Sequence, residues 1–374
     1  MESDQNTIKF LDLKAQYPLV KEEILSRFNS IIDNSAFVCG KQVKEFEDTF
    51  ASYIGVKHCI AVNNGTSALI LTLMANGIGH GDEVILPVNT FIATAEAVSF
   101  VGATPIFVDI QERTQLIDSY KIEEKISKKT KAILPVHLYG QCADMDNINK
   151  IAKKHNLLVI EDACQAHGSL YKGRKAGSLE ICAAFSFYPG KNLGAWGEGG
   201  AVTTNDDIIA DRIRLIRDHG SKKKYYHEII GGNFRIDEFQ GAVLATKLKH
   251  LESWNEKRRA NAETYFKAFK ALKIKGIILP YIEKHNVSNW HLFVIRAKGR
   301  DLLIEHLGKH NIQTGIHYPF PLHLTEAYKG LGYSEGDFPV AERAQKEIIS
   351  LPMYAELSEK DIKKIITEIK EYYK

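Results

Sequence analysis

The sequence lacks the features that mark membrane proteins and disulfide-stabilised proteins. No apolar run approaches the length of a membrane span, and the first ten residues, MESDQNTIKF, contain no apolar signal core. The five cysteines are odd in number, widely spaced and without a CxxC pair, which is typical of reduced thiols and not of a disulfide framework or a zinc site. We therefore expect a cytoplasmic protein that does not enter the membrane.

A large net charge is also missing. Lys and Arg number 49 and Asp and Glu number 46, so the formal charge is only +3, too small to favour nucleic acid as a partner. Any anionic ligand must therefore be held by local groups. The sequence has no internal repeat, no low-complexity tract and no Pro/Gly/Ser-rich linker, so the domains formed by its 374 residues are expected to pack closely.

Short β-rich runs alternate with amphipathic segments from residue 59 to about residue 220. This alternation predicts an α/β domain whose mostly parallel sheet is covered by helices on both faces. Ligands of such sheets collect at the carboxyl ends of the strands, so the residues that follow each strand are the first place to look for a site. The predicted strands are Cys59–Val62, Glu83–Pro87, Thr104–Ile110, Lys131–Val136, Leu157–Glu161, Ala183–Phe187 and Ala201–Thr204, and the predicted helices between them are Ser67–Ala75, Phe91–Val101, Met145–His155 and Ile208–His219.

The alternation of short β-rich runs and amphipathic segments ends before residue 240. Leu244, Leu248, Leu251 and Trp254 form a helical stripe, which predicts one long helix leading out of the first domain. We place a large domain, including an N-terminal arm, at residues 1–250 and a smaller α+β domain at residues 251–374. The small domain is predicted to contain a strand at Trp290–Ala297, a helix from Asp301, a strand near Ile312–His317 and two closing helices.

A single lysine stands between a predicted strand and a glycine-rich loop. The stretch 185–201, FSFYPGKNLGAWGEGGA, begins like a buried strand, breaks at Pro189-Gly190 and presents Lys191 before several glycines. Lysine is seldom buried unless it is paired or used in chemistry, so Lys191 is the first catalytic candidate. The alternative interpretation is a solvated lysine in a surface loop.

Two other strand ends carry polar groups. After the first strand, a tight turn leads to Thr66 and Ser67 at a helix start, where backbone N–H groups and hydroxyls form a phosphate site; an ordinary helix cap is the alternative. The strand at 157–161 ends in Glu161-Asp162, and a carboxylate there needs a cation or several hydrogen-bond donors. A helix-capping role is the alternative for Asp162.

A phosphate cradle, a buried Asp and a lone Lys together meet the requirements of pyridoxal 5′-phosphate (PLP). In this interpretation Lys191 forms the Schiff base, and Asp162 keeps the pyridine nitrogen protonated so that the ring can accept electrons. Phe91, in the turn NTFIAT, could stack on the ring, although an isolated aromatic side chain more often belongs to a core.

Six motifs spread over nearly the whole chain carry a specific resemblance. They are GDEVILPVNTFIAT, PVHLYGQCADM, EDACQAHG, FSFYPGKNLGAWGEGGA, GGNFRIDEFQGA and TGIHYPFPLH. With them the chain resembles the DegT/DnrJ/EryC1/StrS family of PLP-dependent nucleotide-sugar aminotransferases. The resemblance implies the α/β fold of fold-type I PLP transferases (aspartate aminotransferase-like), with a smaller C-terminal α+β domain, and a homodimer with shared active sites.

The resemblance also implies a role for each candidate residue. The catalytic pair would be Lys191, which carries PLP, and Asp162, which pairs with the ring nitrogen. The remaining cofactor contacts would be Gln165 near the phenolic oxygen, Phe91 stacked on the ring, Thr66, Ser67 and Ser186 on the phosphate, and Asn233 reaching the phosphate of the neighbouring subunit; the substrate contacts would be Tyr188, Tyr225, His317, Tyr318 and His323.

The implied reaction is a transamination, because position 191 holds lysine where dehydratases of the family hold histidine. The motif FSFYPGKNLG resembles the corresponding motif of enzymes that aminate C3 of dTDP-linked 3-keto-6-deoxyhexoses. We therefore expect such a sugar as acceptor, L-glutamate as donor and pyridoxamine phosphate as the intermediate form of the cofactor. The alternatives are a UDP-linked keto-sugar aminotransferase, a PLP-dependent sugar dehydratase and a non-catalytic regulatory or sugar-binding relative.

Two further patterns are interpreted as surface features. The run KKKYYH at 222–227 is typical of a solvated loop, although Tyr225 within it matches a family position. His306 and His310 stand at i and i+4 on a predicted helix, as metal ligands would, but no carboxylate in HExxH spacing accompanies them. We therefore expect no metal site.

Overall fold

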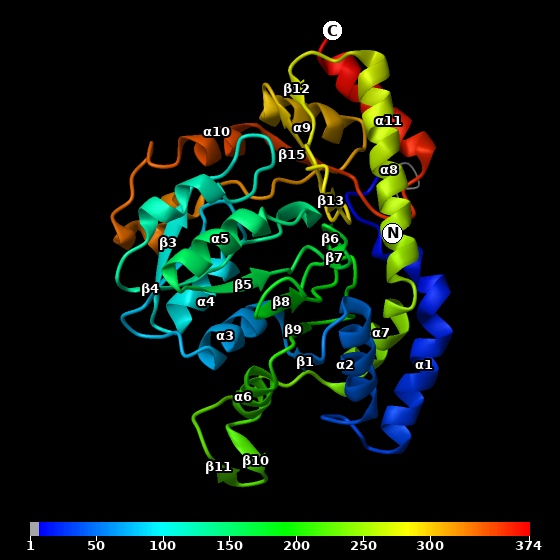
Figure 1. Ribbon diagram of the computed structural model, residues 1–374. Coiled ribbons are helices and arrows are strands. Elements are labelled where there is room, and N and C mark those ends of the chain that lie inside the picture. The colour runs from blue at the N-terminus through cyan, green and yellow to red at the C-terminus, as the bar shows by residue number, and fades with distance from the viewer. Residues whose placement is uncertain (1–6) are drawn as a thin grey trace.

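A seven-stranded sheet forms the centre of the computed structural model, which describes residues 7–374 (Figure 1). The strand order is β1-β9-β8-β5-β4-β2-β3; β9 is antiparallel to both neighbours, and the other neighbouring pairs are parallel. All seven predicted strands are therefore confirmed. Their bounds are β1 (His58–Val62), β2 (Glu83–Pro87), β3 (Thr104–Val108), β4 (Thr130–Ile133), β5 (Leu158–Asp162), β8 (Cys182–Ser186) and β9 (Gly200–Thr204).

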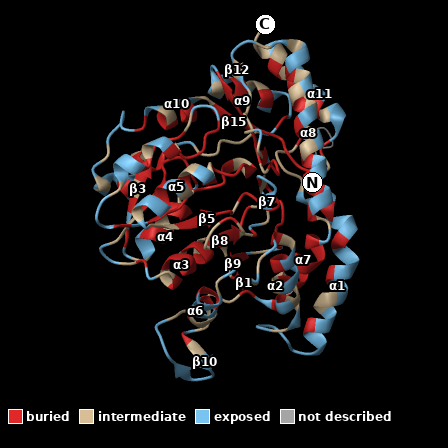
Figure 2. Ribbon diagram, in the orientation of Figure 1, coloured by how far each residue is buried: buried red, intermediate tan, exposed pale blue. Residues whose placement is uncertain are grey.

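Helices cover both faces of this sheet, because successive strand residues point to opposite faces and both faces are apolar. On β5, Val159 joins one buried cluster and Ile160 joins the other. Figure 2 shows buried residues along the strands and on the inner sides of the covering helices. One face is covered by α2 (Lys41–Ile54), α5 (Met145–His155) and α7 (Glu238–Leu248), and the other by α3 (Gly65–Ala75), α4 (Ala93–Phe100) and α6 (Asp207–Arg217).

The predicted long helix is wrong in one respect, because it is broken in two. Its stripe residues are all buried, but α7 ends at Leu248 and α8 (Leu251–Leu272) begins after a turn in which the His250 N–H donates to the Lys247 carbonyl. The turn lets each helix bury its apolar side against a different partner. Leu244 of α7 packs in the core of the large sheet, whereas Phe269 of α8 packs in a separate core.

That separate core belongs to a three-stranded sheet with the order β12-β14-β15. The strand predicted near Ile312–His317 is wrong. Ile312 makes a single bridge to Ile8 and Gly315 makes one to Ser350, so the segment has no single neighbour along which a ladder could form. The elements are β12 (Ile277–Ile278), β14 (Phe293–Ala297) and β15 (Ile348–Leu351), with α8, α9 (Arg300–Lys309) and α11 (Glu359–Tyr372) packed around them.

The domain boundary at residue 250 remains a prediction. Some residues beyond it pack in the core of the large sheet. Leu322 and Phe338, together with Ala341 and Ala344 of α10 (Pro339–Glu347), lie in the core of the large sheet. The N-terminal arm is followed by α1 (Tyr17–Asp33), which packs Val20 and Ile24 against α7.

Smaller elements complete the chain. β6 (Leu170–Tyr171) pairs with both β7 (Arg174–Lys175) and β13 (Asn286–Val287), and the short 3-10 helices are η1 (Leu13–Gln16), η2 (Ser119–Lys121), η3 (Glu123–Lys125), η4 (Leu138–Gly140), η5 (Leu322–Leu324) and η6 (Glu326–Leu331). All five cysteines are free thiols. Across residues 7–374, no helix is long and apolar enough to cross a membrane.

Candidate active site

The predicted catalytic residues lie at the carboxyl ends of two neighbouring parallel strands. Asp162 is the last residue of β5 and Ser186 is the last residue of β8. The chain turns after β8, and the Lys191 N–H donates to the Tyr188 carbonyl at 2.8 Å. The edge of the sheet where strand ends and helix starts converge thus holds the predicted lysine and carboxylate together.

Lys191 has the environment of a reactive amine. Its side chain is half-buried, and within residues 7–374 its Nζ makes no hydrogen bond or ion pair. Burial lowers the pKa of the Lys191 ammonium, and the neighbouring Cys164 and Asp162 only partly oppose this effect. A lowered pKa increases the share of the amine that carries a free lone pair, which a nucleophile or a base requires.

Asp162 is buried and held by two donors. Thr94 Oγ1 donates to its Oδ2 at 2.8 Å, and the Cys164 N–H donates to its Oδ1 at 3.1 Å. Neither interaction is an ion pair, so the carboxylate remains available to a cationic partner. Thr94 lies on α4, at the end of the motif NTFIAT, and the sequence did not indicate a role for it. A threonine at this position does not by itself predict a contact with Asp162, because that contact depends on how α4 packs on the sheet.

The phosphate cradle is built by the start of α3 against the end of β8. The N-cap is Asn64, whose Oδ1 accepts from the Ser67 N–H at 2.8 Å, so the alternative role of Thr66 as an ordinary helix cap is wrong. Thr66 and Ser67 lie in the first turn, and their hydroxyls make no hydrogen bond to any of residues 7–374. A helix N-terminus with two unused hydroxyls is suited to an anion.

Close packing leaves the cradle no room for larger residues. A Cβ on Gly65 would lie 2.6 Å from Ser186 Cβ, and a Cβ on Gly200 would lie 2.3 Å from the Asn64 carbonyl oxygen. Glycine at both positions lets α3, β8 and β9 approach each other. Ser186 thereby comes beside the start of α3, as the phosphate prediction requires.

Three predicted residues form one side of the site. The Gln165 Nε2 donates to the Tyr318 hydroxyl at 3.0 Å, and the Gln165 Oε1 accepts from the Tyr139 N–H at 2.7 Å. Phe91 is 52% exposed, and its ring centroid lies 5.4 Å from that of Tyr318. Phe91 therefore keeps an exposed face, and its role in stacking on the cofactor stays a prediction.

His317 also lies near the lysine. Its Nδ1 is 2.8 Å from Ser350 Oγ, and its ring stacks on Phe10 with centroids 5.5 Å apart. Burial, with a contribution from Lys191, lowers the pKa of His317 to about 4. His317 is thus a neutral imidazole at neutral pH, so it can donate or accept a hydrogen bond without adding charge.

A buried network holds the loop that carries Lys191, and sequence reasoning missed it. Asn192 Nδ2 donates to Asn255 Oδ1 at 2.8 Å and to the Asn289 carbonyl at 3.0 Å, while its Oδ1 lies 3.1 Å from His291 Nδ1. Lys247 of α7 donates to the Gly194 carbonyl at 2.6 Å. These partners lie up to 99 positions away along the chain, so no local pattern could have revealed them.

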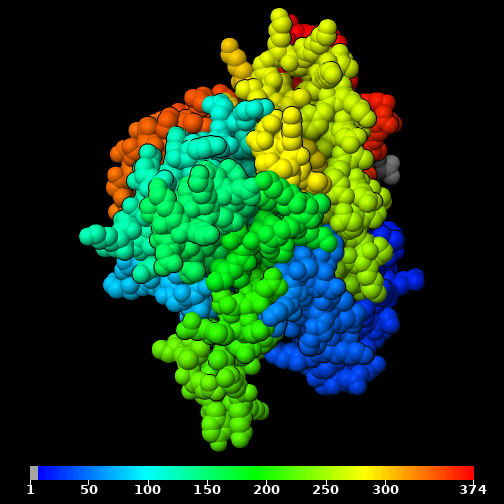
Figure 3. Space-filling view, viewed as in Figure 1, coloured from blue at the N-terminus to red at the C-terminus, as the bar shows by residue number. Residues whose placement is uncertain are grey.

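Three predicted contact residues are not brought to Lys191 within one chain. Tyr225 is 79% exposed on the hairpin β10 (Ser221–Lys223)–β11 (Tyr226–His227), which projects from the body of the molecule (Figures 1 and 3). Asn233 is exposed, and its Oδ1 accepts only from the Arg235 N–H at 3.4 Å among residues 7–374. His323 is 1% exposed, with its Nε2 2.9 Å from Glu342 Oε1 in the core, so a substrate cannot reach it.

The remaining groups fit PLP. An unpartnered amine, a buried carboxylate without a cation, an anion cradle closed by Gly65 and Ser186, and a free aromatic face lie at one edge of the sheet. Tyr188, three residues before Lys191, is 57% exposed. The fold and these groups define an enzyme of the PLP-dependent class, with a mixed and mostly parallel sheet.

The chain belongs to the DegT/DnrJ/EryC1/StrS aminotransferase family, whose model matches residues 18–370. Members of this family are PLP-dependent aminotransferases, and solved relatives contain the pyridoxamine form of the cofactor. The crystal structure of DesV from S. venezuelae in complex with a ketimine intermediate superposes with a TM-score of 0.96 at 43% identity, covering 98% of this chain and 99% of that one. The fold-type I architecture is therefore confirmed.

Curated relatives of similar identity are named as sugar aminotransferases or as a regulatory protein. The dTDP-3-amino-3,6-dideoxy-alpha-D-galactopyranose transaminase of Aneurinibacillus thermoaerophilus is 46% identical, over 98% of this chain and 99% of its own. The pleiotropic regulatory protein of Geobacillus stearothermophilus is 45% identical, over 98% of this chain and 99% of its own. Relatives named as UDP-sugar aminotransferases are 40% and 41% identical.

Proposed function

We propose that this enzyme moves the amino group of L-glutamate to C3 of a dTDP-3-keto-6-deoxyhexose. The observation that carries the proposal is the free Lys191 amine beside Asp162, at the same sheet edge as the start of α3. Relatives named as dTDP-3-amino-sugar transaminases, at 44% and 46% identity, support the choice of acceptor. We also place the enzyme in the cytoplasm, where its five free thiols stay reduced.

The residues of the site have separate roles in the proposed reaction. When bound, PLP supplies an electron sink for the charge left on carbon when a proton is removed. The first turn of α3, with Thr66 and Ser67, and the Ser186 hydroxyl bind the phosphate. Asp162, oriented by Thr94, pairs with the ring nitrogen.

Lys191 carries the proton transfers. Its Nζ takes the proton from Cα of glutamate in the first half of the cycle and returns a proton to C3 of the sugar in the second half. General acid–base catalysis of this kind contributes about 10²–10⁴-fold. The lowered pKa of the amine keeps more of it in the basic form that the first step needs. His317 lies near Lys191, Tyr318 lies near Asp162, and Tyr188 is exposed in the same loop as the lysine; these three are the proposed substrate contacts.

The substrate is tested by turnover of paired dTDP-3-keto-6-deoxyhexoses that differ only in configuration at C4. Glutamate consumption and amino-sugar formation are measured together, with a UDP-linked keto sugar in parallel and Lys191→Ala as control. We expect one C4 epimer to be aminated with one glutamate consumed per product. Turnover of the UDP-sugar alone would contradict the choice of dTDP, and product without glutamate consumption would indicate a dehydratase.

We also propose a homodimer with shared active sites. Asn233 and Tyr225 are exposed and lie outside the site of their own chain, which is the placement expected of residues that serve a partner. Exposed apolar side chains such as Phe37, Val38 and Trp196 offer surface for the contact.

Mixing two inactive variants tests the shared site. Lys191→Ala and Asn233→Asp subunits are unfolded and refolded together, so that a mixed dimer contains one site with both native residues. Activity should return to about a quarter of the wild-type level, because half of the dimers are mixed and each has one complete site. Recovery no greater than the sum of the separate variants would contradict shared sites while leaving the reaction itself untouched.

A further inference from the structure

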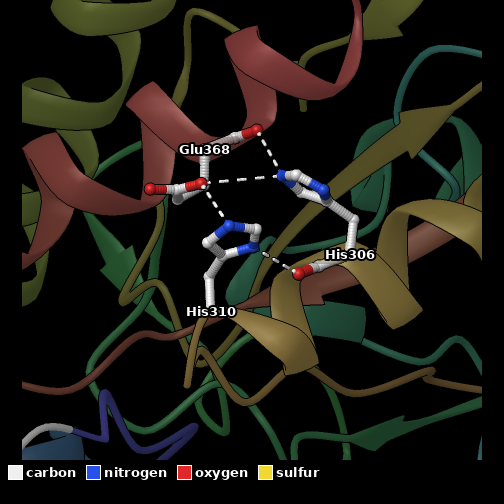
Figure 4. Close-up of side chains that lie close together, drawn as sticks. All are labelled: His306, His310 and Glu368. Atoms are coloured by element: carbon white, nitrogen blue, oxygen red, sulfur yellow. Dashed lines mark hydrogen bonds and ion pairs between the residues drawn. The ribbon is translucent and has the colours of Figure 1, made fainter.

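Two histidines and a glutamate from distant parts of the chain meet between two helices of the C-terminal region. His306 and His310 lie one turn apart on α9, and Glu368 comes from α11, 62 positions beyond His306. One ring nitrogen of each histidine and one carboxylate oxygen of Glu368 lie within 4.8 Å of one another (Figure 4). The structure thus provides the carboxylate that the HExxH spacing did not.

His310 presents a lone pair to Glu368. Its Nδ1 lies 2.8 Å from the backbone carbonyl of His306, which can only accept, so Nδ1 carries a hydrogen. In the neutral ring Nε2 is then an acceptor, and it faces Glu368 Oε2 at 3.4 Å. Two acceptors that face each other need a proton or a cation between them. The backbone hydrogen bond on the far nitrogen is the usual device that orients a histidine metal ligand.

His306 completes the cluster on the other side of the same oxygen. Its Nε2 lies 3.6 Å from Glu368 Oε2 and 3.1 Å from the Glu368 backbone carbonyl. Without a metal, this nitrogen donates its hydrogen to the carbonyl. A metal ion at Nε2 requires this hydrogen to move to Nδ1, which gives the other neutral tautomer, and because protons compete with the ion for the ring nitrogens, binding is expected to weaken at acid pH.

The distances match those of a tetrahedral zinc site. Nitrogen and oxygen ligands lie about 2.1 Å from Zn²⁺, so two ligands separated by a tetrahedral angle are about 3.4 Å apart. The distances from Glu368 Oε2 to the two ring nitrogens are 3.4 and 3.6 Å. The side chains therefore need little movement to enclose an ion. His306 is half-buried and His310 is exposed, which leaves an entry path and room for a water ligand.

We propose that His306, His310 and Glu368 bind one divalent transition-metal ion, with Zn²⁺ as the best fit and water as the fourth ligand. Two imidazoles and one carboxylate suit zinc and its neighbours in the first transition row, not Mg²⁺ or Ca²⁺. The ion fastens α9 to α11. Its role is structural, because the three ligands belong to helices that pack around the small sheet and not to the edge that carries Lys191.

The test uses the PLP-loaded enzyme, prepared without a polyhistidine tag and freed of metal by a chelator. ZnCl₂ is titrated by calorimetry and Tm is measured with and without the ion. Glu368→Gln and His310→Ala remove one ligand each. His80→Ala is the matched control, since His80 is exposed and belongs to no three-ligand cluster among residues 7–374.

We expect the wild type and the His80 variant to bind one more Zn²⁺ per chain than the two ligand variants, and to gain roughly 2–5 °C in Tm on adding it. Zinc bound elsewhere, at the cofactor or at cysteines, contributes equally to all variants and cancels. Co²⁺ should give visible absorption of a four-coordinate ion in the wild type, which the ligand variants lose. Equal stoichiometry and equal Co²⁺ spectra in the wild type and the His310 variant would overturn the proposal.

Discussion

Thr94 Oγ1 lies 2.8 Å from Asp162 Oδ2, and the same hydroxyl lies 2.8 Å from Thr90 Oγ1. All three residues are buried. These two hydrogen bonds, from Thr90 to Thr94 and from Thr94 to Asp162, connect α4 and the turn before it with the end of β5. It fixes the direction in which the carboxylate points before any ligand arrives, so Thr94 is a positioning residue for the proposed cofactor contact.

Replacing Thr94 by Val should weaken catalysis while preserving shape. A hydrogen bond to a charged group contributes about 1.5–3 kcal/mol, so kcat/KM should fall roughly tenfold to a hundredfold. Steady-state kinetics with saturating PLP measures the loss. Thr94→Ser, which keeps the hydroxyl, should stay close to the wild type. Wild-type kinetics in the Val variant would show that Asp162 does not depend on this contact.

Gly65→Ala should damage the phosphate cradle. The added methyl group would lie 2.6 Å from Ser186 Cβ, so the start of α3 and the end of β8 must separate. We expect the Kd for PLP to rise at least about tenfold, since overpacking of this kind costs about 1–3 kcal/mol. Fluorescence titration of the apoenzyme measures it. Gly330→Ala is the control, because a Cβ there meets nothing within 4 Å.

Asn192→Ala should loosen the loop that carries Lys191. The substitution leaves the Asn255 and Asn289 acceptors without their donor in a buried region, at about 1–3 kcal/mol for each unsatisfied group. We expect a lower free energy of unfolding in urea and a fall in kcat that is larger than any change in KM. If stability falls but kcat does not, the network supports the fold without positioning the lysine.

His317 should make the protein sensitive to acid. The unfolded chain protonates this histidine near pH 6.5, but the folded chain does so only near pH 4. Between these values the unfolded state binds more protons, so the free energy of unfolding decreases as the pH falls from 6.5 to 4. Urea unfolding across this range should show a slope smaller by up to about one proton in His317→Gln. An unchanged slope would show that His317 titrates normally in the folded state.

Local sequence patterns predicted the central sheet and directed attention to the ends of its strands. β2 and α5 have the predicted bounds, and Asp162, Ser186 and Lys191 lie together because strand ends of a parallel sheet share one edge. Patterns failed where a contact depends on packing between distant segments. Thr94 reaches Asp162 across the sheet, and Asn192 meets partners beyond residue 250.

Other differences between the sequence-based expectations and the structure have the same origin. Asn64 and Thr66 are both acceptable caps, and only the path of the turn decides between them. His323 stands in a motif otherwise near the site, yet its pairing with Glu342 turns it into the core. The break between α7 and α8 follows a continuous apolar stripe, so hydrophobic periodicity alone could not reveal it.

The return of residues 322–344 into the large-sheet core affects how the C-terminal region can move. The chain leaves this core through α8, forms β14 and α9, re-enters with Leu322 to Ala344 and leaves again into β15. The small sheet is therefore anchored by several crossings and cannot swing on one hinge. Any closing motion over a substrate must bend the chain at each crossing, and a fragment cut at residue 250 would lose part of the apolar interior of the large domain.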